Sequence, residues 1–346
     1  MKNEELIMLQ SLPLDIKIAK SKIRIEEFVR AMGGEDKVYI SFSGGKDSTV
    51  LLHLVRSVYP NIEGVFCDTG LEFLEIKQFV NKQENIKIIR PKMSFKQVIE
   101  NYGYPVVSKE QALYIRQYRT TKSQHVRDIR WNGSVGRIGK ISEKHKYLVN
   151  APFKVSEQCC DVMKKRPFKK YEKESGRYPI LGIMASESQL RRSQYLRAGG
   201  CNSFDSKRVN SRPLGFWTEQ DILEYLVKFK LEYATIYGDI IKNEEGKWVT
   251  TGERRTGCVF CGFGVHMEKS PNRYQRLEKT HPQLHQYCMD KLGFKEVCEY
   301  MNIPYKNEEV ENEQHSNNWW AYRSFKEKRC SSRCISIWYS YYKTYS

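Results

Sequence analysis

Short apolar runs alternate along much of the chain with stretches whose apolar residues recur at helical spacing. Residues 1–36 carry apolar side chains among charged ones at such spacing, which predicts a helical lead-in. The apolar runs predict strands at 38–42, 64–67, 86–89 and 179–184. Helices are expected between them, over 48–55 and 76–80. Strands that alternate with helices predict an α/β fold with a doubly wound, mostly parallel sheet, in which ligands bind at the carboxyl ends of the strands.

The middle of the chain departs from this alternation. An insertion at about 104–150 separates the third and fourth strands, and its residues 109–146 hold ten Lys or Arg against three Asp or Glu. Such a stretch is equally typical of a solvated basic face and of a polyanion-binding surface. Further on, Thr218 is expected as the N-cap of a helix and Asp221 as its N3 acid.

Three parts are expected along the chain. The helical lead-in ends near residue 36, and a main α/β domain follows over 37–305 with helical and cysteine-rich C-terminal additions. This domain contains the basic insertion and a cysteine-rich segment at about 256–266. Residues 306–346 are expected to form a polar linker and an aromatic, basic tail.

Composition narrows the functional classes. Of 346 residues, 40% are hydrophobic and 12% aromatic, which excludes a wholly disordered chain. No apolar run is long enough to span a bilayer, and the charged N-terminus lacks a signal peptide, so a cytoplasmic protein is expected. The net charge of +17 favours an anionic partner such as a nucleotide, a nucleic acid or a sulfate ester. In such a protein the ten cysteines suggest thiols, metal ligands or catalysis more than disulfides.

A glycine loop carries the clearest chemical signal. The segment Ser43-Gly44-Gly45-Lys46-Asp47-Ser48 lies between a predicted strand and a predicted helix. Two glycines let the backbone approach a bound oxyanion, and the start of the helix presents unpaired N–H groups. Further charge and hydrogen-bond donors come from Lys46 and the hydroxyl groups of Ser41, Ser43 and Ser48. An ordinary glycine turn is the alternative, but the hydroxyl groups and the strand–loop–helix context favour phosphate binding.

The cysteines carry the second signal. Cys258 and Cys261 form a Cys-x-x-Cys pair, and Cys159 is followed directly by Cys160. A Cys-x-x-Cys pair can hold one metal centre, and two adjacent cysteines suit the separate irons of a cubane better than one tetrahedral ion. Four-thiolate zinc remains an alternative, as does burial of the adjacent pair in the core. The remaining cysteines of the α/β domain are expected to be structural, namely Cys67, Cys201, Cys288 and Cys298.

Four segments together resemble a known family. The segment from Ser41 to Ser48 resembles the PP-loop of the adenine nucleotide α-hydrolases, which have a Rossmann-like fold. Three others resemble the phosphoadenylylsulfate (PAPS) and adenylylsulfate (APS) reductase branch, namely Asp68-Thr69-Gly70, Gly182 to Ser188 with Arg191 and Arg192, and Arg212-Pro213-Leu214 with Trp217 and Asp221. The cysteine pattern, with Lys164 and Pro167 after the adjacent pair, resembles the [4Fe–4S] ligands of assimilatory APS reductases. The resemblance covers roughly residues 20–305.

The resemblance implies a specific set of site residues. ATP, APS or PAPS is the expected nucleotide, with Mg²⁺ as a further candidate cofactor. Expected nucleotide contacts are Ser41, Ser43, Gly44, Gly45, Lys46, Asp47, Ser48, Asp68, Thr69, Gly70, Glu187 and Ser188. The expected catalytic residues are Lys46, Asp47, Asp68 and Arg191. The expected ligands of a [4Fe–4S] cluster are Cys159, Cys160, Cys258 and Cys261.

Two departures from the reductases affect the expected reaction. The reductase branch carries a nucleophilic Cys near the C-terminus in a Glu-Cys-Gly context, whereas Cys330 and Cys334 lie in other contexts. The intact Ser-Gly-Gly-Lys-Asp-Ser loop is also more similar to the ATP-using members. An enzyme that adenylates an acceptor and transfers sulfur to it is therefore expected, with tRNA, DNA or a sulfur-donor protein as partners. A reductase that releases sulfite and a non-catalytic nucleic-acid-binding protein remain the alternatives.

Overall fold

The computed structural model describes residues 1–134, 138–206 and 208–307. These residues form two compact units. Unit 1 comprises Met1–Lys92 and Val162–Val259, and unit 2 comprises the described residues of Met93–Asp161 and those from Phe260 to Asn307. The basic insertion expected at about 104–150 therefore belongs to unit 2, whereas the glycine loop belongs to unit 1.

Unit 1 is built on a six-stranded sheet in the order β3-β2-β1-β5-β7-β6. All neighbouring strands are parallel except β6 and β7, which are antiparallel. This architecture confirms the predicted α/β fold with a mostly parallel sheet. The strands are β1 (Val38–Ser41), β2 (Gly64–Cys67), β3 (Ile86–Ile89), β5 (Tyr178–Leu181), β6 (Asn202–Ser203) and β7 (Asn210–Ser211).

Two of the four predicted strands are observed with the expected bounds, β2 and β3. The strand expected at 179–184 ends earlier, at Leu181, because the parallel register pairs it with Ser41, the last residue of β1. After Ser41 the backbone N–H of Phe42 still donates to the Val65 carbonyl of β2, and the glycine loop then begins at Ser43. Both strands therefore end at the same edge of the sheet, where the glycine loop begins.

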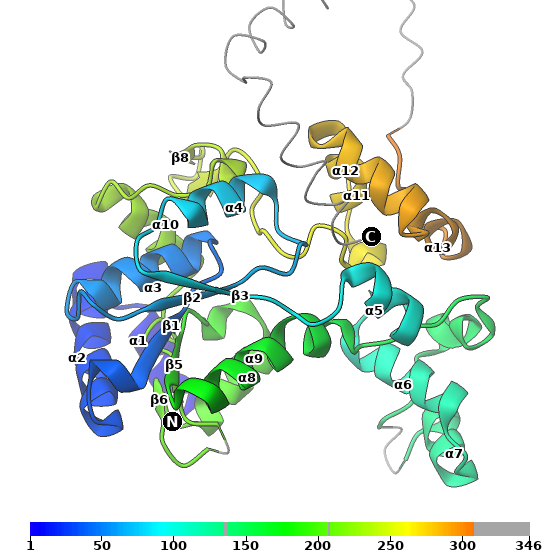
Figure 1. Cartoon of the computed structure of the whole chain (residues 1–346), viewed down its shortest axis with the longest axis horizontal. Helices are drawn as coiled ribbons and strands as arrows, with labels where there is room; N and C mark the ends of the chain where they lie inside the picture. The colour runs from blue at the N-terminus through cyan, green and yellow to red at the C-terminus, as the bar shows by residue number, and fades with distance from the viewer. Residues whose placement is uncertain (135–137, 207, 308–346) are drawn as a thin grey trace, which may run out of the picture. The chain divides into compact units, whose positions relative to one another are not determined.

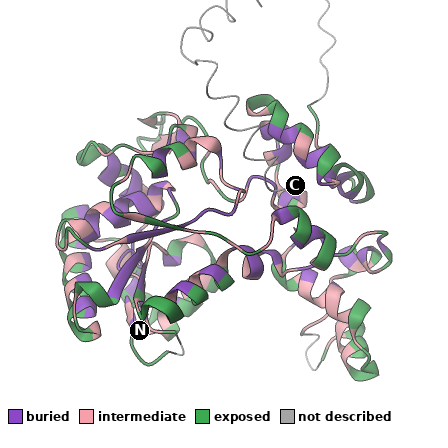
Figure 2. Ribbon diagram, viewed as in Figure 1, coloured by how far each residue is buried: buried purple, intermediate pink, exposed green. Residues whose placement is uncertain are grey.

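Helices cover both faces of this sheet. Figure 1 shows α3 and α4 on one side of it and α8 on the other. Figure 2 shows the centre of the sheet as buried: all four residues of β2 are buried, and in β1 the side chains of Val38, Tyr39 and Ile40 are fully buried. The helices of unit 1 are α1 (Asn3–Gln10), α2 (Leu14–Met32), α3 (Lys46–Arg56), α4 (Leu74–Asn81), α8 (Arg166–Ser175), α9 (Gln189–Arg197) and α10 (Glu219–Lys228).

The predicted N-cap at Thr218 agrees with the start of α10. The helices α1 and α2 lie in the region of the expected helical lead-in, which belongs to unit 1. At α10 the side chain of Thr218 accepts a hydrogen bond from the Asp221 backbone N–H, and Asp221 accepts from the Thr218 backbone, which confirms the predicted capping box. An antiparallel hairpin, β8 (Ile240–Lys242) and β9 (Trp248–Thr250), follows α10.

Strand order places the site. After β3 the chain returns to the sheet as β5, on the opposite side of β1. In open parallel sheets, the point where the strand order reverses leaves a crevice at the carboxyl ends of the strands. In unit 1 this point lies at the end of β1, directly before the glycine loop.

Unit 2 is mainly helical. Its centre is Phe294, whose ring lies 5.2 Å from that of Tyr104, 5.9 Å from that of Tyr274 and 6.3 Å from that of Phe95. A two-stranded parallel ladder joins β4 (Val106–Val107) to β10 (Gly262–Phe263). The helices are α5 (Phe95–Tyr102), α6 (Lys109–Thr120), α7 (Gln124–Asn132), α11 (Arg273–Thr280), α12 (Pro282–Gln286) and α13 (Phe294–Tyr300).

Arginines of the basic insertion bond within unit 2. Arg116 pairs with both carboxylate oxygens of Glu157, at 2.6 and 3.0 Å. Arg119 donates to the carbonyl of Phe153. Arg130 donates to the carbonyl of Gly139, and its guanidinium lies 4.3 Å from the centre of the Tyr114 ring. These three arginines therefore help to stabilise the fold of unit 2. Lys122 and Lys144 remain exposed to solvent.

Unit 2 packs two histidines together, a buried His145 and a partly buried His266. The rings of His145 and His266 meet edge to face with centroids 5.2 Å apart, and none of their four nitrogen atoms has a hydrogen-bond partner among the described residues. Burial, the His266 ring and the charge of Lys144 lower the pKa of His145 to about 4. Burial and Lys144 also lower the pKa of His266.

This pair predicts acid sensitivity. An unfolded histidine has a pKa near 6.5, so the unfolded chain binds protons more tightly than the folded one, and stability falls as the pH drops from about 6.5 towards 4. His145 alone contributes a loss of about 3 kcal/mol over that range. Chemical denaturation at several pH values measures the effect. His145→Phe should flatten the dependence, whereas His125→Ala, at an exposed position of α7, should leave it unchanged.

None of the helices in the described part of the chain combines the length and apolar character needed to cross a membrane. The expected aromatic and basic tail, with Cys330 and Cys334, lies outside the described residues.

Candidate functional site

The glycine loop connects β1 to α3 and is stabilised by its own hydroxyl groups. Ser48 Oγ accepts from the backbone N–H of Ser43 at 3.1 Å and lies 3.0 Å from Ser43 Oγ. It also donates to the carbonyl of Gly45, the N-cap of α3. These bonds hold the loop at the start of α3, where the first N–H groups carry the positive end of the helix dipole.

Gly44 allows the loop to lie against α4. Its φ is +71°, in the left-handed region that favours glycine. A Cβ atom at this position would lie only 2.7 Å from the methyl groups of Ile76 and Val80 on α4. The path of the loop therefore depends on glycine for both backbone conformation and space.

Lys46, the first residue of α3, is buried although it is charged. Its Nζ donates to the carbonyl of Arg254 at 3.0 Å and lies 3.4 Å from a carboxylate oxygen of Glu219 and 3.6 Å from one of Asp47. Its backbone N–H donates to the hydroxyl of Tyr237 at 3.2 Å. The structure thus adds Glu219, Arg254 and Tyr237 to the surroundings of the loop.

Sequence reasoning missed these three residues. They follow the loop by more than 170 positions and lie in segments with no phosphate-binding signature. The signal that exists is indirect: Glu219 is the first residue of a helix whose cap was predicted, and Arg254 directly precedes the cysteine-rich segment.

Asp47 is partly buried beside Lys46. Burial raises its pKa, the carboxylates of Glu187 and Glu219 act in the same direction, and the positive charge of Lys46 opposes them. One of its carboxylate oxygens has no hydrogen-bond partner among the described residues. A carboxylate in this position would be stabilised by a cation arriving with an anionic ligand.

The second predicted segment begins where β2 ends. Asp68 lies 2.9 Å from Nζ of Lys77 and 3.4 Å from Nε of Arg90, so its charge is compensated. Thr69 donates to Glu72 through both its backbone N–H, at 3.0 Å, and its hydroxyl, at 2.7 Å. The segment is a tightly bonded turn at the same edge of the sheet as the glycine loop.

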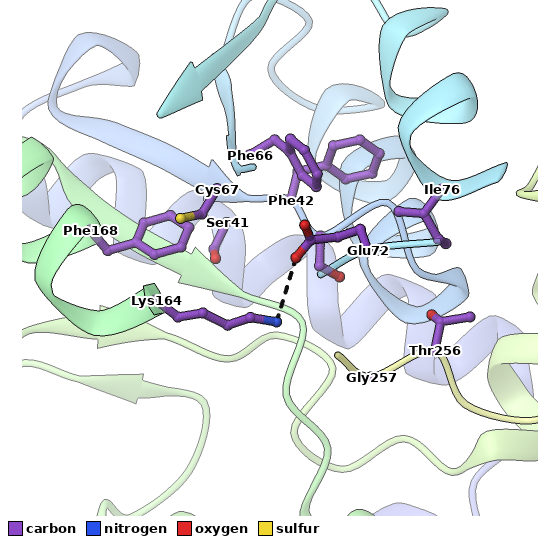
Figure 3. Close-up of a pocket in the computed structure, with 11 residues that line it drawn as sticks. Ser41, Phe42, Phe66, Cys67, Glu72, Ile76, Lys164, Phe168, Thr256 and Gly257 are labelled. Atoms are coloured by element: carbon purple, nitrogen blue, oxygen red, sulfur yellow. Dashed lines mark ion pairs between the residues drawn. The ribbon is translucent and has the colours of Figure 1, made fainter. Parts of the chain in front are cut away.

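A cavity of about 190 Å³ opens between these two strand ends, as Figure 3 shows. Glu72 points towards Lys164 across it, with 3.9 Å between the charged atoms. Burial raises the pKa of the Cys67 thiol to about 12, so Cys67 is a poor nucleophile, in agreement with its expected structural role. The cavity is lined by Ser41, Phe42, Ser43, Phe66, Cys67, Glu72, Ile76, Lys164, Phe168, Thr256 and Gly257.

The third predicted segment lies close to the loop. Ser188 is the N-cap of α9, and its hydroxyl accepts from the Arg191 backbone N–H. Glu187 forms ion pairs with Arg191 and Arg255, the latter at 2.7 Å. Because the carboxylate of Glu187 influences the pKa of Asp47, these segments lie within electrostatic reach of each other.

The four cysteines of the predicted cluster divide between the units. Cys159, Cys160 and Cys261 belong to unit 2, and Cys258 belongs to unit 1. Burial raises the pKa of the Cys261 thiol, and nearby Cys160 acts in the same direction. Within the described residues, no group of three or more His, Cys, Asp or Glu side chains is arranged to hold a metal ion. The assignment of these four cysteines as ligands of a [4Fe–4S] cluster therefore remains a prediction from the sequence pattern.

The other expected structural cysteines are buried. Burial raises the pKa of Cys201 to about 11 and that of Cys298 to about 12, and it raises that of Cys288 as well. All three thiols therefore stay protonated, as expected for core residues.

Comparisons with known proteins give the relationships of the chain. It is 27% identical to an uncharacterized protein of Methanocaldococcus jannaschii over 65% of this chain, but it spans only 36% of that protein's length. A second uncharacterized protein from the same organism is also 27% identical, and this chain spans 46% of its length. The adenosine 5'-phosphosulfate reductase of Staphylococcus haemolyticus is 24% identical, with 77% of this chain and 87% of that protein covered.

A solved phosphoadenylyl-sulfate reductase from Candida auris matches at 14% identity and a TM-score of 0.36, covering 68% of this chain and 90% of that one. The family model of the phosphoadenosine phosphosulfate reductase domain matches residues 37–134 and 116–262. These two matches run without a gap from the start of β1 to the cysteine-rich segment, and they include the glycine loop and all three further segments of the site. The chain therefore belongs to the phosphoadenosine phosphosulfate reductase domain family.

Proposed function

We propose that unit 1 binds the phosphates of ATP at the start of α3 and that the enzyme transfers the adenylyl group to an acceptor. The observation that carries the proposal is the intact loop, whose hydroxyl groups, glycines and buried Lys46 surround the helix N-terminus. Backbone N–H groups and the helix dipole favour a phosphate there, and Lys46 adds a full charge.

The reaction would need little from the protein beyond positioning and charge. An acceptor oxygen or sulfur attacks the α-phosphorus, and pyrophosphate leaves. Donors at the loop stabilise the negative charge that builds up on the leaving group, which is the usual source of catalysis in phosphoryl chemistry. Lys46 and the N–H groups of α3 would perform this task, and Asp47 is the carboxylate that a nucleotide-bound Mg²⁺ would take.

The other predicted segments complete the proposed site. Asp68 and Arg191 each lie in a network of ion pairs, and both would orient the nucleotide relative to the acceptor. Their neighbours Thr69, Gly70, Glu187 and Ser188 would contact the nucleotide.

A second reaction is favoured by the comparisons. Several relatives are named adenosine 5'-phosphosulfate reductases, and the chain covers most of the length of one of them. In that reaction sulfite is released from APS at the expense of a thiol reductant. The same loop would then hold the sulfate or phosphate end of APS.

One assay separates the two reactions. Purified protein is incubated with ATP and Mg²⁺, and in parallel with APS and dithiothreitol, and pyrophosphate and sulfite are measured. ATP-dependent pyrophosphate release without sulfite formation supports adenylation. Sulfite formation from APS assigns the protein to the reductases instead. Binding of neither nucleotide in a calorimetric titration would contradict both proposals.

We also propose a [4Fe–4S] cluster held by Cys159, Cys160, Cys258 and Cys261. The support is the sequence pattern and the proximity of Cys160 to Cys261 within unit 2. A bound cluster would carry its own charge, and an iron from which one of these thiolates dissociated could bind sulfur.

The cluster makes a direct prediction. Protein purified without oxygen should be brown and contain iron and sulfide in equal amounts. Serine at any of the four positions should lower the iron content, because each thiolate is a ligand. Cys288→Ser and Cys298→Ser serve as matched controls, since both thiols are buried in unit 2 and lie outside the pattern. Stoichiometric zinc without sulfide, after expression with ample iron, would contradict the cluster.

A further inference from the structure

The chain itself occupies two anion-binding donors of the glycine loop. The backbone N–H of Lys46 donates to Oη of Tyr237, at 3.2 Å. The Nζ of the same residue donates to the carbonyl oxygen of Arg254, at 3.0 Å. Both atoms belong to the group that we propose for phosphate binding, yet both are directed to protein acceptors.

Tyr237 is held firmly at this position. It ends the short helix η6 (Thr235–Tyr237) and is buried, and its hydroxyl lies 2.6 Å from Oγ1 of Thr256. The backbone N–H groups of Gly252 and Glu253 bond to the carbonyls of Tyr237 and Ile236. Burial raises the pKa of Tyr237 to about 12, so the hydroxyl is neutral at physiological pH. The segment before Thr256 is therefore bonded to the tyrosine by both backbone and side chain.

The loop is shaped for this contact. A Cβ atom on Gly45, the N-cap of α3, would lie 3.1 Å from Oη of Tyr237. That spacing is tighter than an ordinary carbon–oxygen contact, so the absence of a side chain at Gly45 lets the tyrosine hydroxyl approach the helix start. Oη of Tyr237 therefore lies at the start of α3, the end of the helix whose N–H groups favour an oxyanion.

Two ion pairs with exposed arginines connect the segment before Thr256 to neighbouring helices. Arg254 pairs with Glu219 at the start of α10, and Arg255 pairs with Glu187 beside α9. The side chains of the two arginines are 79% and 60% exposed, so these pairs are weak in water. A polyphosphate offers both guanidinium groups stronger, bidentate partners than a single carboxylate does.

We infer that Tyr237 and the segment Arg254–Thr256 form a latch that closes the phosphate loop until a polyphosphate ligand displaces it. The inference rests on the proposed nucleotide binding at this loop. One N–H group makes one good hydrogen bond, so Oη and a phosphate oxygen compete for the backbone of Lys46. Only the open state binds the ligand. The apparent affinity is therefore the affinity of the open state multiplied by the fraction of molecules that are open.

Removing the tyrosine hydroxyl tests the latch. Tyr237→Phe keeps the buried ring and deletes the competing oxygen, so it should bind ATP about three- to tenfold more tightly by calorimetry, as expected for the loss of one competing hydrogen bond. Thr256→Val should act in the same direction with a smaller effect, because Oη remains but loses its anchor. Tyr178→Phe, at an exposed position where β5 begins, is the control and should not change the affinity.

A second measurement separates the latch from the function. In ligand-free protein, hydrogen exchange at the Lys46 amide and in residues 252–257 should be faster in Tyr237→Phe than in the wild type, because the amide has lost its acceptor. Unchanged exchange overturns the latch whether or not any nucleotide binds. Faster exchange without nucleotide binding to either protein supports the latch and rejects the proposed function. Weaker or equal ATP binding by Tyr237→Phe shows that the hydroxyl does not compete, and the latch is wrong.

Discussion

Gly44→Ala is expected to weaken ATP binding by about a hundredfold and to destabilise unit 1 by about 2–5 kcal/mol. At φ +71° an alanine pays the cost of the left-handed conformation. Its methyl group would also lie 2.7 Å from Ile76 and Val80, so α4 or the loop has to move. A displaced loop no longer aims its N–H groups at the phosphate. Calorimetry with ATP and chemical denaturation measure the two effects.

Gly176→Ala is the matched control for stability. Gly176 has a φ of +67° where α8 ends, but a Cβ atom there would meet nothing within 4 Å. Gly176→Ala should lower the free energy of unfolding by about 1–2 kcal/mol, from the left-handed conformation alone, and it should bind ATP with the wild-type affinity. Equal destabilisation by the two substitutions would show that contact with α4 does not constrain the loop. Unchanged ATP affinity in folded Gly44→Ala would contradict the proposed phosphate site.

Lys17→Met is expected to lower the free energy of unfolding by about 3–5 kcal/mol. Nζ of Lys17, on α2, lies 2.7 Å from the carboxylate of Asp221 on α10, and both side chains are almost fully buried. Removing the lysine leaves a buried carboxylate whose remaining partner is Thr218, and the cost of that unpaired charge is the dominant effect. Adding Asp221→Asn should restore part of the loss, because the carboxylate charge is removed too.

A second ion pair between the same two helices provides the control. Lys228 of α10 pairs with Asp15 of α2, but these side chains are 42% and 73% exposed. Lys228→Met should therefore change the stability by no more than about 1 kcal/mol. An equally small loss of stability in both lysine variants would contradict this prediction. It would show that Lys17 is solvated in the folded protein in spite of its burial.

Much of unit 1 follows from local features of the sequence. The strands β2 and β3 were predicted with their observed bounds because each is a short apolar run ended by a polar residue or glycine. The capping box at Thr218 depends on two residues three positions apart, and the phosphate loop on eight consecutive residues. Such features are readable because hydrogen bonding and burial within them involve neighbours along the chain.

The surroundings of the loop were decided by tertiary structure. Tyr237 and Thr256 lie about 190 and 210 residues beyond the loop, and they reach it only because the sheet order brings α10 and the segment after it to the end of β1. Composition also did not reveal that Arg116 and Arg130 form hydrogen bonds within unit 2. The sequence by itself determined the bounds of β2 and β3, the cap at Thr218 and the position of the glycine loop, because these features depend on neighbouring residues. Which distant groups pair with the buried charge of Lys46 depended on the folded chain, because a buried charge is stabilised by whichever partners the packing brings within hydrogen-bonding distance.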